Sequence, residues 1–210
     1  NVFITLSSVK AVADQVVGEL SEEVKPNPIT HYGKSKLLAE QYILSKPIPE
    51  GKRVYILRPC MIHGHGNKGN LNLLYQLVSK GIPYPLGSFE NKRSFLSIEN
   101  LCFVIENLIS QQPGSGIYNV ADDEAISTNE LVALIGEATG KLSKIWKLPK
   151  AIIQTLGKVG TSLHLPFNSE KLQKLTENYV VSNAKIKTTL GISLPITTKE
   201  GLVKTIQSFQ

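Results

Sequence analysis

The sequence predicts an α/β fold with a parallel β-sheet. Three short, largely apolar runs typical of strands, at residues 1–8, 53–57 and 116–121, are separated by longer segments with helical periodicity. This alternation favours parallel strands, because consecutive parallel strands need a crossover that usually contains a helix. With 210 residues, 41% of them hydrophobic and 19% charged, the chain can bury a sizeable core in one or two domains.

The elements before residue 98 follow from periodicity and from the placement of proline and glycine. Residues 1–8 read as a buried parallel strand that ends in two serines, and a polar loop then reaches Pro28. A helix is expected over residues 31–45, where Leu37 and Tyr42 contribute to an apolar side. The next expected elements are a strand at 53–57, a helix at 70–80, a turn or short edge strand at 83–87 and an extended segment at 95–97.

The rest of the chain is mainly helical in pattern. Ser127 and Glu130 form the Ser-x-x-Glu signature of a capping box, which predicts that a helix begins there. A strand is expected at 116–121, and residues 144–148 read as a strand of a smaller domain. Further helices are expected at 98–110, 149–159, 169–175, 183–190 and 197–209.

Tyr32 and Lys36 form the most informative pair in the chain. At positions i and i+4 of a helix they lie one turn apart on the same face, so the ammonium group can lie beside the phenol oxygen. A nearby cation stabilises a phenolate, which suits a tyrosine that acts as a general acid/base. Ser8, at the end of the preceding strand, can hydrogen-bond the same substrate oxygen. The pair predicts proton transfer at a sugar or alcohol oxygen; the alternative is an ordinary solvated helix face.

Several motifs in a fixed order resemble the extended short-chain dehydrogenases/reductases, and within them the NAD-dependent nucleotide-sugar epimerases. The resemblance implies the C-terminal part of a Rossmann-like doubly wound parallel sheet and a smaller α/β substrate-binding lobe. The motifs are the strand before Ser8, Tyr32 to Lys36 with Glu40, Leu57-Arg58-Pro59, Gly64-His65-Gly66, Arg93-Ser94-Phe95 and the tail from Lys187 to Gly191.

The domain organisation implied by this resemblance divides the chain near residue 60. Residues 1–60 would complete the NAD-binding domain and carry the serine and the Tyr-x-x-x-Lys motif. Residues 61–210 would form mainly the nucleotide-sugar-binding lobe, with residues 95–121 returning to the large sheet.

The resemblance also implies roles for four residues of the first domain. Ser8, Tyr32 and Lys36 match the family's catalytic residues. Tyr32, Lys36 and Pro59 match its cofactor contacts, with the lysine also holding the nicotinamide ribose.

Four residues match the family's substrate contacts: Ser8, Asn70, Leu71 and Arg93. Arg93 would hold the diphosphate through a bidentate guanidinium fork, and its alternative is a surface salt bridge. Asn70 and Leu71 begin a helix whose N-terminus suits an anion. The alternative for Asn70 is a helix cap, a role that is compatible with anion binding.

NAD is the implied cofactor. In the family its pyrophosphate binds a glycine-rich strand–turn–helix, and this chain starts at what resembles the fifth strand. We therefore expect the main NAD-binding half to be absent, and these residues alone to be inactive and to bind no measurable NAD. The segment from Gly64 to Gly69 matches G-x-G-x-x-G, but Pro59 and the residues after it separate it from the strand. We favour a place for this loop in the sugar-nucleotide pocket.

The expected reaction is the 4-epimerisation of a UDP-hexose through a 4-keto intermediate. Sugar 4,6-dehydratases need an acidic pair after the serines, whereas Val9 and Lys10 follow Ser8 here, which disfavours dehydration. Met61 and His63 stand where many 4-epimerases carry an asparagine and a tyrosine. The alternatives are an NAD(P)-dependent sugar-nucleotide reductase or dehydratase, and a non-catalytic nucleotide-sugar-binding fragment.

The composition limits the classes of molecule that the chain is expected to bind. The net charge is +6, but the 23 Lys and Arg residues are scattered, which favours an anionic diphosphate substrate and not a nucleic acid. Cys60 and Cys102 have no paired spacing, which suits a reducing cytoplasm. His63 and His65 have no clustered acidic or cysteine partners, so no metal is expected.

Location and assembly are expected to be those of a cytoplasmic enzyme. No apolar run approaches the roughly 20 residues needed to cross a bilayer, and no signal peptide precedes the first strand, so no membrane partner is expected. The resemblance implies a homodimer, in which the helix at 31–45 and the next large helix form a four-helix bundle with their partners.

Overall fold

The computed structural model describes residues 1–162 and 169–209, which form two compact units. Each unit is assembled from segments that are far apart in the sequence. Unit 1 comprises Asn1–Gly64, Ser94–Ala125 and Tyr179–Gly201, and unit 2 comprises His65–Arg93, Ile126–Asn178 and Leu202–Gln210.

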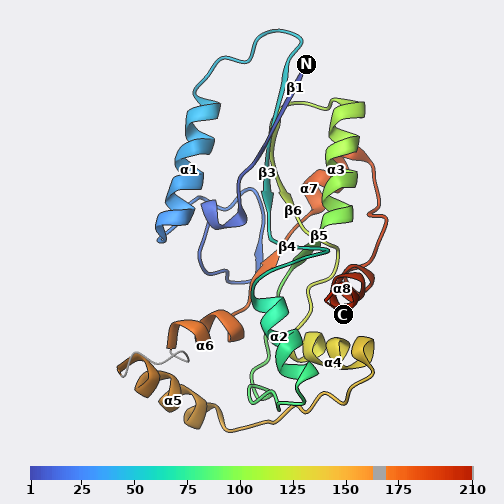
Figure 1. Ribbon diagram of the computed structural model, residues 1–210. Coiled ribbons are helices and arrows are strands. Elements are labelled where there is room, and N and C mark those ends of the chain that lie inside the picture. The colour runs from blue at the N-terminus through green and yellow to red at the C-terminus, as the bar shows by residue number, and fades with distance from the viewer. Residues whose placement is uncertain (163–168, 210) are drawn as a thin grey trace. The chain divides into compact units, whose positions relative to one another are not determined.

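Unit 1 is built on a parallel sheet, which confirms the predicted α/β class. Its strands are β1 (Val2–Leu6), β3 (Arg53–Pro59) and β6 (Gly116–Val120), in the order β1-β3-β6 (Figure 1). Leu6 pairs with Leu57, and Leu57 pairs with Tyr118, so the three carboxyl ends lie at one edge of the sheet.

The first strand is only partly buried within the described residues. Among the described residues β1 pairs only with β3, so it is an edge strand. Phe3 and Leu6 are 53% and 46% exposed. An apolar run shows that a strand has apolar neighbours on its faces, but not how many strands flank it.

Helices cover both faces of this sheet. Tyr55 and Leu57 pack with α3 (Ile98–Gln111) and α7 (Ala184–Leu190) in one apolar cluster. Arg58, one residue further along, points to the other face because strand side chains alternate. There it contacts α1 (His31–Leu44), which lies across the sheet from α3 (Figure 1). This arrangement is the doubly wound packing that the sequence predicted.

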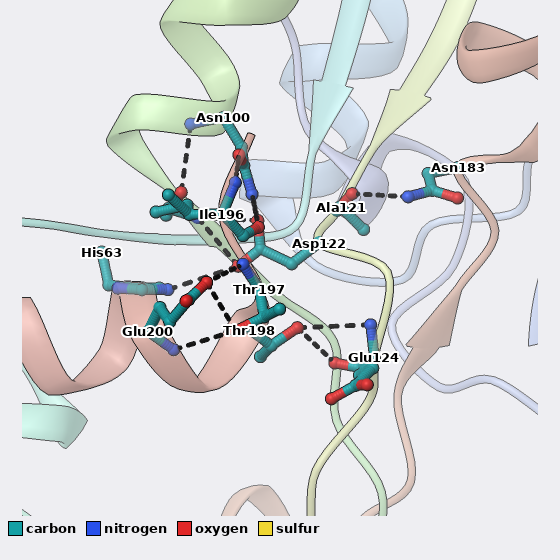
Figure 2. A network of polar contacts seen from close by, with 11 residues as sticks. His63, Asn100, Ala121, Asp122, Glu124, Asn183, Ile196, Thr197, Thr198 and Glu200 are labelled. Carbon is teal, nitrogen blue, oxygen red and sulfur yellow. Dashed lines mark hydrogen bonds and ion pairs between the residues drawn. The ribbon is translucent and has the colours of Figure 1, made fainter. Parts of the chain in front are cut away.

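A buried polar network joins the segment that contains α7 to the rest of unit 1. The Asp122 carboxylate, just after β6, accepts hydrogen bonds from the backbone N–H of Ser97 at 3.1 Å and from Asn100 Nδ2 at 2.7 Å. Asn100 Nδ2 also donates to the carbonyl of Ile196 at 3.0 Å (Figure 2). Further along, the Thr198 hydroxyl donates to the carbonyl of Glu124.

Several short elements of unit 1 were not predicted from the sequence, and one, at residues 95–97, was predicted only as an extended segment. They are the 3-10 turn Val9–Ala11, β2 (Glu19–Leu20) with its parallel partner β7 (Val180–Val181), and β4 (Met61–His63), which pairs with β5 (Phe95–Ser97). Elements of two or three residues carry too little periodicity to be recognised from sequence.

Unit 2 is mainly helical. The predicted capping box is confirmed: Ser127 and Glu130 bond reciprocally at the start of α4 (Thr128–Thr139). The other helices are α2 (Asn70–Ser79), α5 (Lys150–Ser162) and α6 (Ser169–Thr176). The last helix of the chain is α8 (Thr198–Gln207). No helix in the described part of the chain is long and apolar enough to cross a membrane.

The predicted strand at 144–148 is wrong as a continuous element. Ile145 forms an isolated parallel bridge with Tyr84, and Lys147 forms an isolated antiparallel bridge with Leu86. The facing segment contains Pro83 and Pro85, which lack N–H donors and so cannot sustain a ladder.

Candidate active site

The start of α1 is fixed by local hydrogen bonds. Thr30 is its N-cap and accepts a hydrogen bond from the backbone N–H of Gly33 at 3.2 Å. The Asp14 carboxylate accepts from the backbone N–H groups of Ile29 at 2.6 Å and Thr30 at 3.0 Å, and from the Thr30 hydroxyl. Burial alone raises the pKa of Asp14, but these hydrogen bonds outweigh burial and lower the pKa below its usual value. The carboxylate is therefore a stable anchor for the segment that leads to Tyr32.

Gly33 lets α1 approach the 3-10 turn directly. A Cβ at this position would lie 2.4 Å from the carbonyl oxygen of Lys10 and 2.7 Å from Pro28 Cβ. The oxygen belongs to the backbone and cannot turn aside. Only glycine therefore allows the residue after Tyr32 to lie against the turn that begins just after Ser8.

We expect Gly33→Ala to destabilise the protein by about 1–3 kcal/mol, because overpacking exceeds the gain of about 1 kcal/mol in helix propensity. Urea unfolding followed by circular dichroism measures the change. Lys34→Ala, at the next and exposed position of α1, is the control and is expected to change stability by less than about 0.5 kcal/mol. Equal stability of the two variants would contradict the close approach.

Lys36 reaches the carboxyl end of β1. Its Nζ donates to the carbonyl of Leu6 at 3.3 Å and lies 5.8 Å from the centre of the Tyr32 ring. Ser8 is the N-cap of the 3-10 turn, is buried, and its hydroxyl accepts from the backbone N–H of Lys10 at 3.2 Å. Tyr32 is 55% exposed, so its ring is accessible. The structure thus places Tyr32 and Lys36 one turn apart, with the lysine at the end of the strand that leads to Ser8.

A buried ionic network, not predicted from the sequence, lies beside Ser8 and Lys36. Glu40 on α1 accepts from Arg58 Nε at 2.9 Å and from Arg58 Nη2 at 2.6 Å. The Ser7 hydroxyl donates to the same carboxylate at 2.5 Å. Glu40 therefore links α1 to β3 through Arg58 and to Ser7, the residue before Ser8. The signal was present in the spacing, because Glu40 follows Lys36 by four residues and so lies on the same helix face.

A second Tyr-x-x-x-Lys pair lies at the other end of the same helix. Lys46 Nζ lies 4.5 Å from the centre of the Tyr42 ring. This pair borders a hollow of about 410 Å³ whose lining includes Asn1 and Arg53, at the amino ends of β1 and β3. Parallel sheets carry their chemistry at the carboxyl edge, so position favours Tyr32 and Lys36 over Tyr42 and Lys46.

Pro59, the expected cofactor contact, is the last residue of β3 and pairs with Val120 at the carboxyl edge of the sheet. Tyr32, Lys36 and Pro59 thus share unit 1 with Ser8. An accessible phenol and a lysine at the carboxyl edge fit the nicotinamide ribose of NAD.

The glycine motif from Gly64 to Gly69 lies nearer to a strand than the sequence predicted. Strand β4 ends at His63, immediately before Gly64. However, β4 pairs with β5 in a separate two-stranded sheet and not in the large sheet. A Cβ on Gly64 would lie 2.7 Å from Ile98 Cγ2, while Gly66 and Gly69 have φ of 73° and 132°. Close packing and backbone conformation account for these glycines.

The expected substrate residues Asn70 and Leu71 lie at the start of α2 in unit 2. Asn70 does not cap the helix, because Gly69 occupies the N-cap position and no side-chain cap bond forms. The Leu71 side chain is 2% exposed, so only its backbone N–H is suited to a phosphate.

Arg93, the fourth expected substrate contact, is half-buried in unit 2. Its Nη2 lies 4.0 Å from Glu177 Oε1, a long ion pair, and its backbone N–H donates to the carbonyl of Ile126 at 2.9 Å. The backbone of Arg93 is therefore fixed, and its guanidinium group lies at long ion-pair distance from the Glu177 carboxylate.

His63 lies beside Asp122, with its Nε2 3.6 Å from Oδ2 (Figure 2). Among the described residues, no group of three or more His, Cys, Asp or Glu side chains is arranged to hold a metal ion.

Comparison with known proteins identifies the family. The model of the 3-beta hydroxysteroid dehydrogenase/isomerase family matches residues 1–149. The chain belongs to this family. The match contains Ser8, Tyr32, Lys36, Pro59 and Arg93, and it confirms the predicted relation to NAD-dependent epimerases and dehydratases.

This member of the 3-beta hydroxysteroid dehydrogenase/isomerase family is similar to two curated epimerases. It is 34% identical over 213 residues to UDP-glucose 4-epimerase of Vibrio cholerae, a match that covers 99% of this chain and 62% of the relative. It is 27% identical to the N-acetyl-alpha-D-glucosaminyl-diphospho-ditrans,octacis-undecaprenol 4-epimerase of Escherichia coli O157:H7, over 86% of this chain and 57% of the relative. The chain thus spans less than two thirds of the length of both.

A solved structure confirms the fold. The UDP-glucose 4-epimerase of Thermus thermophilus, in complex with NAD, has a TM-score of 0.71 and 20% sequence identity, over 99% of this chain and 63% of that one. The family fold therefore extends over almost the whole chain, beyond residue 149.

Proposed function

We propose that this chain carries the acid/base residues of an NAD-dependent nucleotide-sugar epimerase, and that the reaction is the 4-epimerisation of a UDP-hexose through a 4-keto intermediate. The observation that carries the proposal is the hydrogen bond from Lys36 to Leu6 at the carboxyl end of β1. This bond places Lys36, the partner of Tyr32, at the end of the strand that precedes Ser8. The similarity to UDP-glucose 4-epimerase supports the choice of substrate.

In this mechanism Tyr32 removes the proton from the sugar O4 and later returns it. Ser8 donates a hydrogen bond to the same oxygen, and the Lys36 ammonium stabilises the phenolate. Asn70, the backbone N–H of Leu71 and the Arg93 guanidinium are the diphosphate contacts that we propose for unit 2.

Tyr32, Lys36 and Pro59 would hold the nicotinamide end of NAD. When bound, NAD supplies reversible uptake of the hydride from the sugar carbon. The exposed Leu38 and Tyr42 side chains on α1 leave an apolar surface that suits the expected homodimer.

One other reaction and one other substrate are compatible with the same residues. An NAD(P)-dependent reductase needs the same tyrosine, lysine and serine, and only the fate of the 4-keto sugar distinguishes it. A lipid-linked sugar diphosphate is a second candidate substrate, because the E. coli relative is named for one. The exposed apolar and lysine-rich stretch at residues 141–162 favours this candidate.

The direct test incubates the full-length protein with NAD and UDP-glucose and follows the configuration at C4 by proton NMR. We expect a mixture of UDP-glucose and UDP-galactose at equilibrium, with no net consumption of NAD. Net oxidation or reduction of the cofactor would assign the protein to the dehydrogenases or reductases instead.

Arg93→Ala is expected to raise the KM for UDP-hexose about 10- to 100-fold with little change in kcat, because it removes a charged hydrogen bond to a diphosphate whose charge is equal in the ground and transition states. Lys92→Ala removes the same charge from the neighbouring exposed position and is the control. Steady-state kinetics and titration of UDP measure both. If the two variants show the same KM, the assignment of Arg93 as a diphosphate contact is wrong.

A further inference from the structure

Although the Lys and Arg residues are scattered along the chain as a whole, residues 141–162 of unit 2 carry an excess of positive charge. This stretch contains five lysines and no Asp or Glu, in a protein whose total net charge is +6. All five lysines are exposed: Lys141, Lys144, Lys147, Lys150 and Lys158. Lys141 and Lys150 make local contacts, a hydrogen bond to the carbonyl of Ser79 and a cation–π contact with Phe89. No acidic side chain of this stretch neutralises the charge.

The same stretch exposes large apolar side chains. Leu142 and Trp146 are 89% and 54% exposed, and Ile152, Leu156 and Val159 are also exposed. The last three recur at i, i+4 and i+7 along α5, so they form one row on the helix. The neighbouring Ile153 is buried and anchors the helix.

The lysines of α5 lie away from this row. At 100° per residue, Lys150 and Lys158 project from the polar flank of the helix, while Ile152, Leu156 and Val159 share the apolar side. We call residues 141–162, with these lysines and exposed apolar side chains, the basic apolar surface.

We propose that the basic apolar surface docks on a membrane that contains anionic lipids. A helix with lysines on its polar side and aliphatic residues on the other lies in the plane of the lipid interface. Lysines near an anionic surface add attraction, and a tryptophan such as Trp146 favours the headgroup level. The 13 residues of α5 extend about 20 Å, which is too short to cross a hydrocarbon core of about 30 Å.

Charge and composition favour lipid over the other occupants. A nucleic acid would pair with the lysines but would leave the exposed aliphatic row in water. A second copy of this chain would bring five further lysines against the first five, because a two-fold interface presents the same patch on both sides. Only a partner that is anionic at its surface and apolar beneath it matches both features.

Trp146 makes the docking directly measurable, because it is the only tryptophan in the chain. We expect its fluorescence to shift to the blue when vesicles of phosphatidylcholine and phosphatidylglycerol (3:1) are added, and the protein to sediment with them. Vesicles of phosphatidylcholine alone should bind at least about tenfold more weakly. Raising NaCl from about 0.1 M to about 0.5 M should weaken binding to the anionic vesicles, because salt screens exposed charges. No substrate or NAD is needed, so the result is independent of the reaction proposed above.

Two triple variants with the same net charge distinguish the effect of where the lysines lie from the effect of the total charge of the protein. Lys144→Glu, Lys147→Glu and Lys158→Glu together should weaken binding to anionic vesicles by about 100-fold or more. Lys25→Glu, Lys52→Glu and Lys199→Glu, at exposed positions of unit 1, should weaken it by less than about fivefold. The apolar contribution is tested by Leu156→Ser, expected to weaken binding about tenfold. The control is Ile109→Ser at an exposed position of α3, expected to have little effect.

Several results would overturn the proposal. Equal binding by the two triple variants would mean that the net charge, and not this surface, attracts the protein to lipid. A shift of Trp146 fluorescence when the protein is concentrated without vesicles would assign the surface to a second copy. A shift with an RNA or DNA oligomer and none with vesicles would assign it to nucleic acid.

Discussion

Tyr32→Phe is expected to lower the kcat of UDP-hexose epimerisation by about 10²- to 10⁴-fold, the usual contribution of general acid–base catalysis. The substitution keeps the ring but removes the oxygen that takes the O4 proton. Because Tyr32 is 55% exposed, the stability of the protein should change little. Steady-state kinetics on the full-length protein and thermal unfolding measure the two effects.

The second tyrosine–lysine pair of α1 supplies the matched control. Tyr42 is similarly exposed and also has a lysine four residues later, but it lies toward the amino edge of the sheet. Tyr42→Phe should therefore leave kcat unchanged. If Tyr32→Phe retained full turnover, the assignment of Tyr32 as the acid/base would be wrong, and a non-catalytic binding protein would be the better description.

Glu40→Gln is expected to lower the free energy of unfolding by about 3–5 kcal/mol, because it leaves the buried Arg58 guanidinium without a carboxylate. The amide also loses one acceptor for Arg58 and the Ser7 hydroxyl. Chemical denaturation of the variant measures the loss. The effect should be large because Glu40 and Arg58 are 2% and 3% exposed.

Two controls test whether the loss comes from an unpaired buried charge. Glu40→Met combined with Arg58→Met removes both charges and should recover much of the stability, since an apolar replacement of a whole buried pair is often neutral. Lys187→Met breaks the exposed ion pair with Asp123 in the same unit and should cost at most about 1 kcal/mol. If Lys187→Met and Glu40→Gln lowered the free energy of unfolding by similar amounts, burial of the ion pair would not be the cause of the loss of stability.

The main helices, the large sheet and the shared helix face of Tyr32 and Lys36 could be predicted because their signals are local. The acid/base role of this pair is still a proposal. The Tyr32 and Lys36 spacing defines a helix face, and Ser127 with Glu130 defines a helix start. The predicted runs at residues 53–57 and 116–121 identified β3 and β6. The family resemblance then added Pro59, Asn70, Leu71 and Arg93, whose roles are still proposals.

What failed or was missed depends on contacts between distant residues. The exposure of β1 follows from the number of strands beside it, and β4 depends on pairing with β5, whose residues lie 34 positions further along. The strand expected at 144–148 was limited by prolines in the segment that faces it.

The sequence by itself determined the α/β class, the helix that bears Tyr32 and Lys36, and the family. Tertiary structure alone decided which of two identical Tyr-x-x-x-Lys spacings lies at the carboxyl edge, because that depends on where Lys36 meets the end of β1. It also decided that Glu40 is buried against Arg58 and Ser7. Spacing fixes which side chains share a helix face, but only the packing of that face against the sheet fixes which atoms each side chain meets.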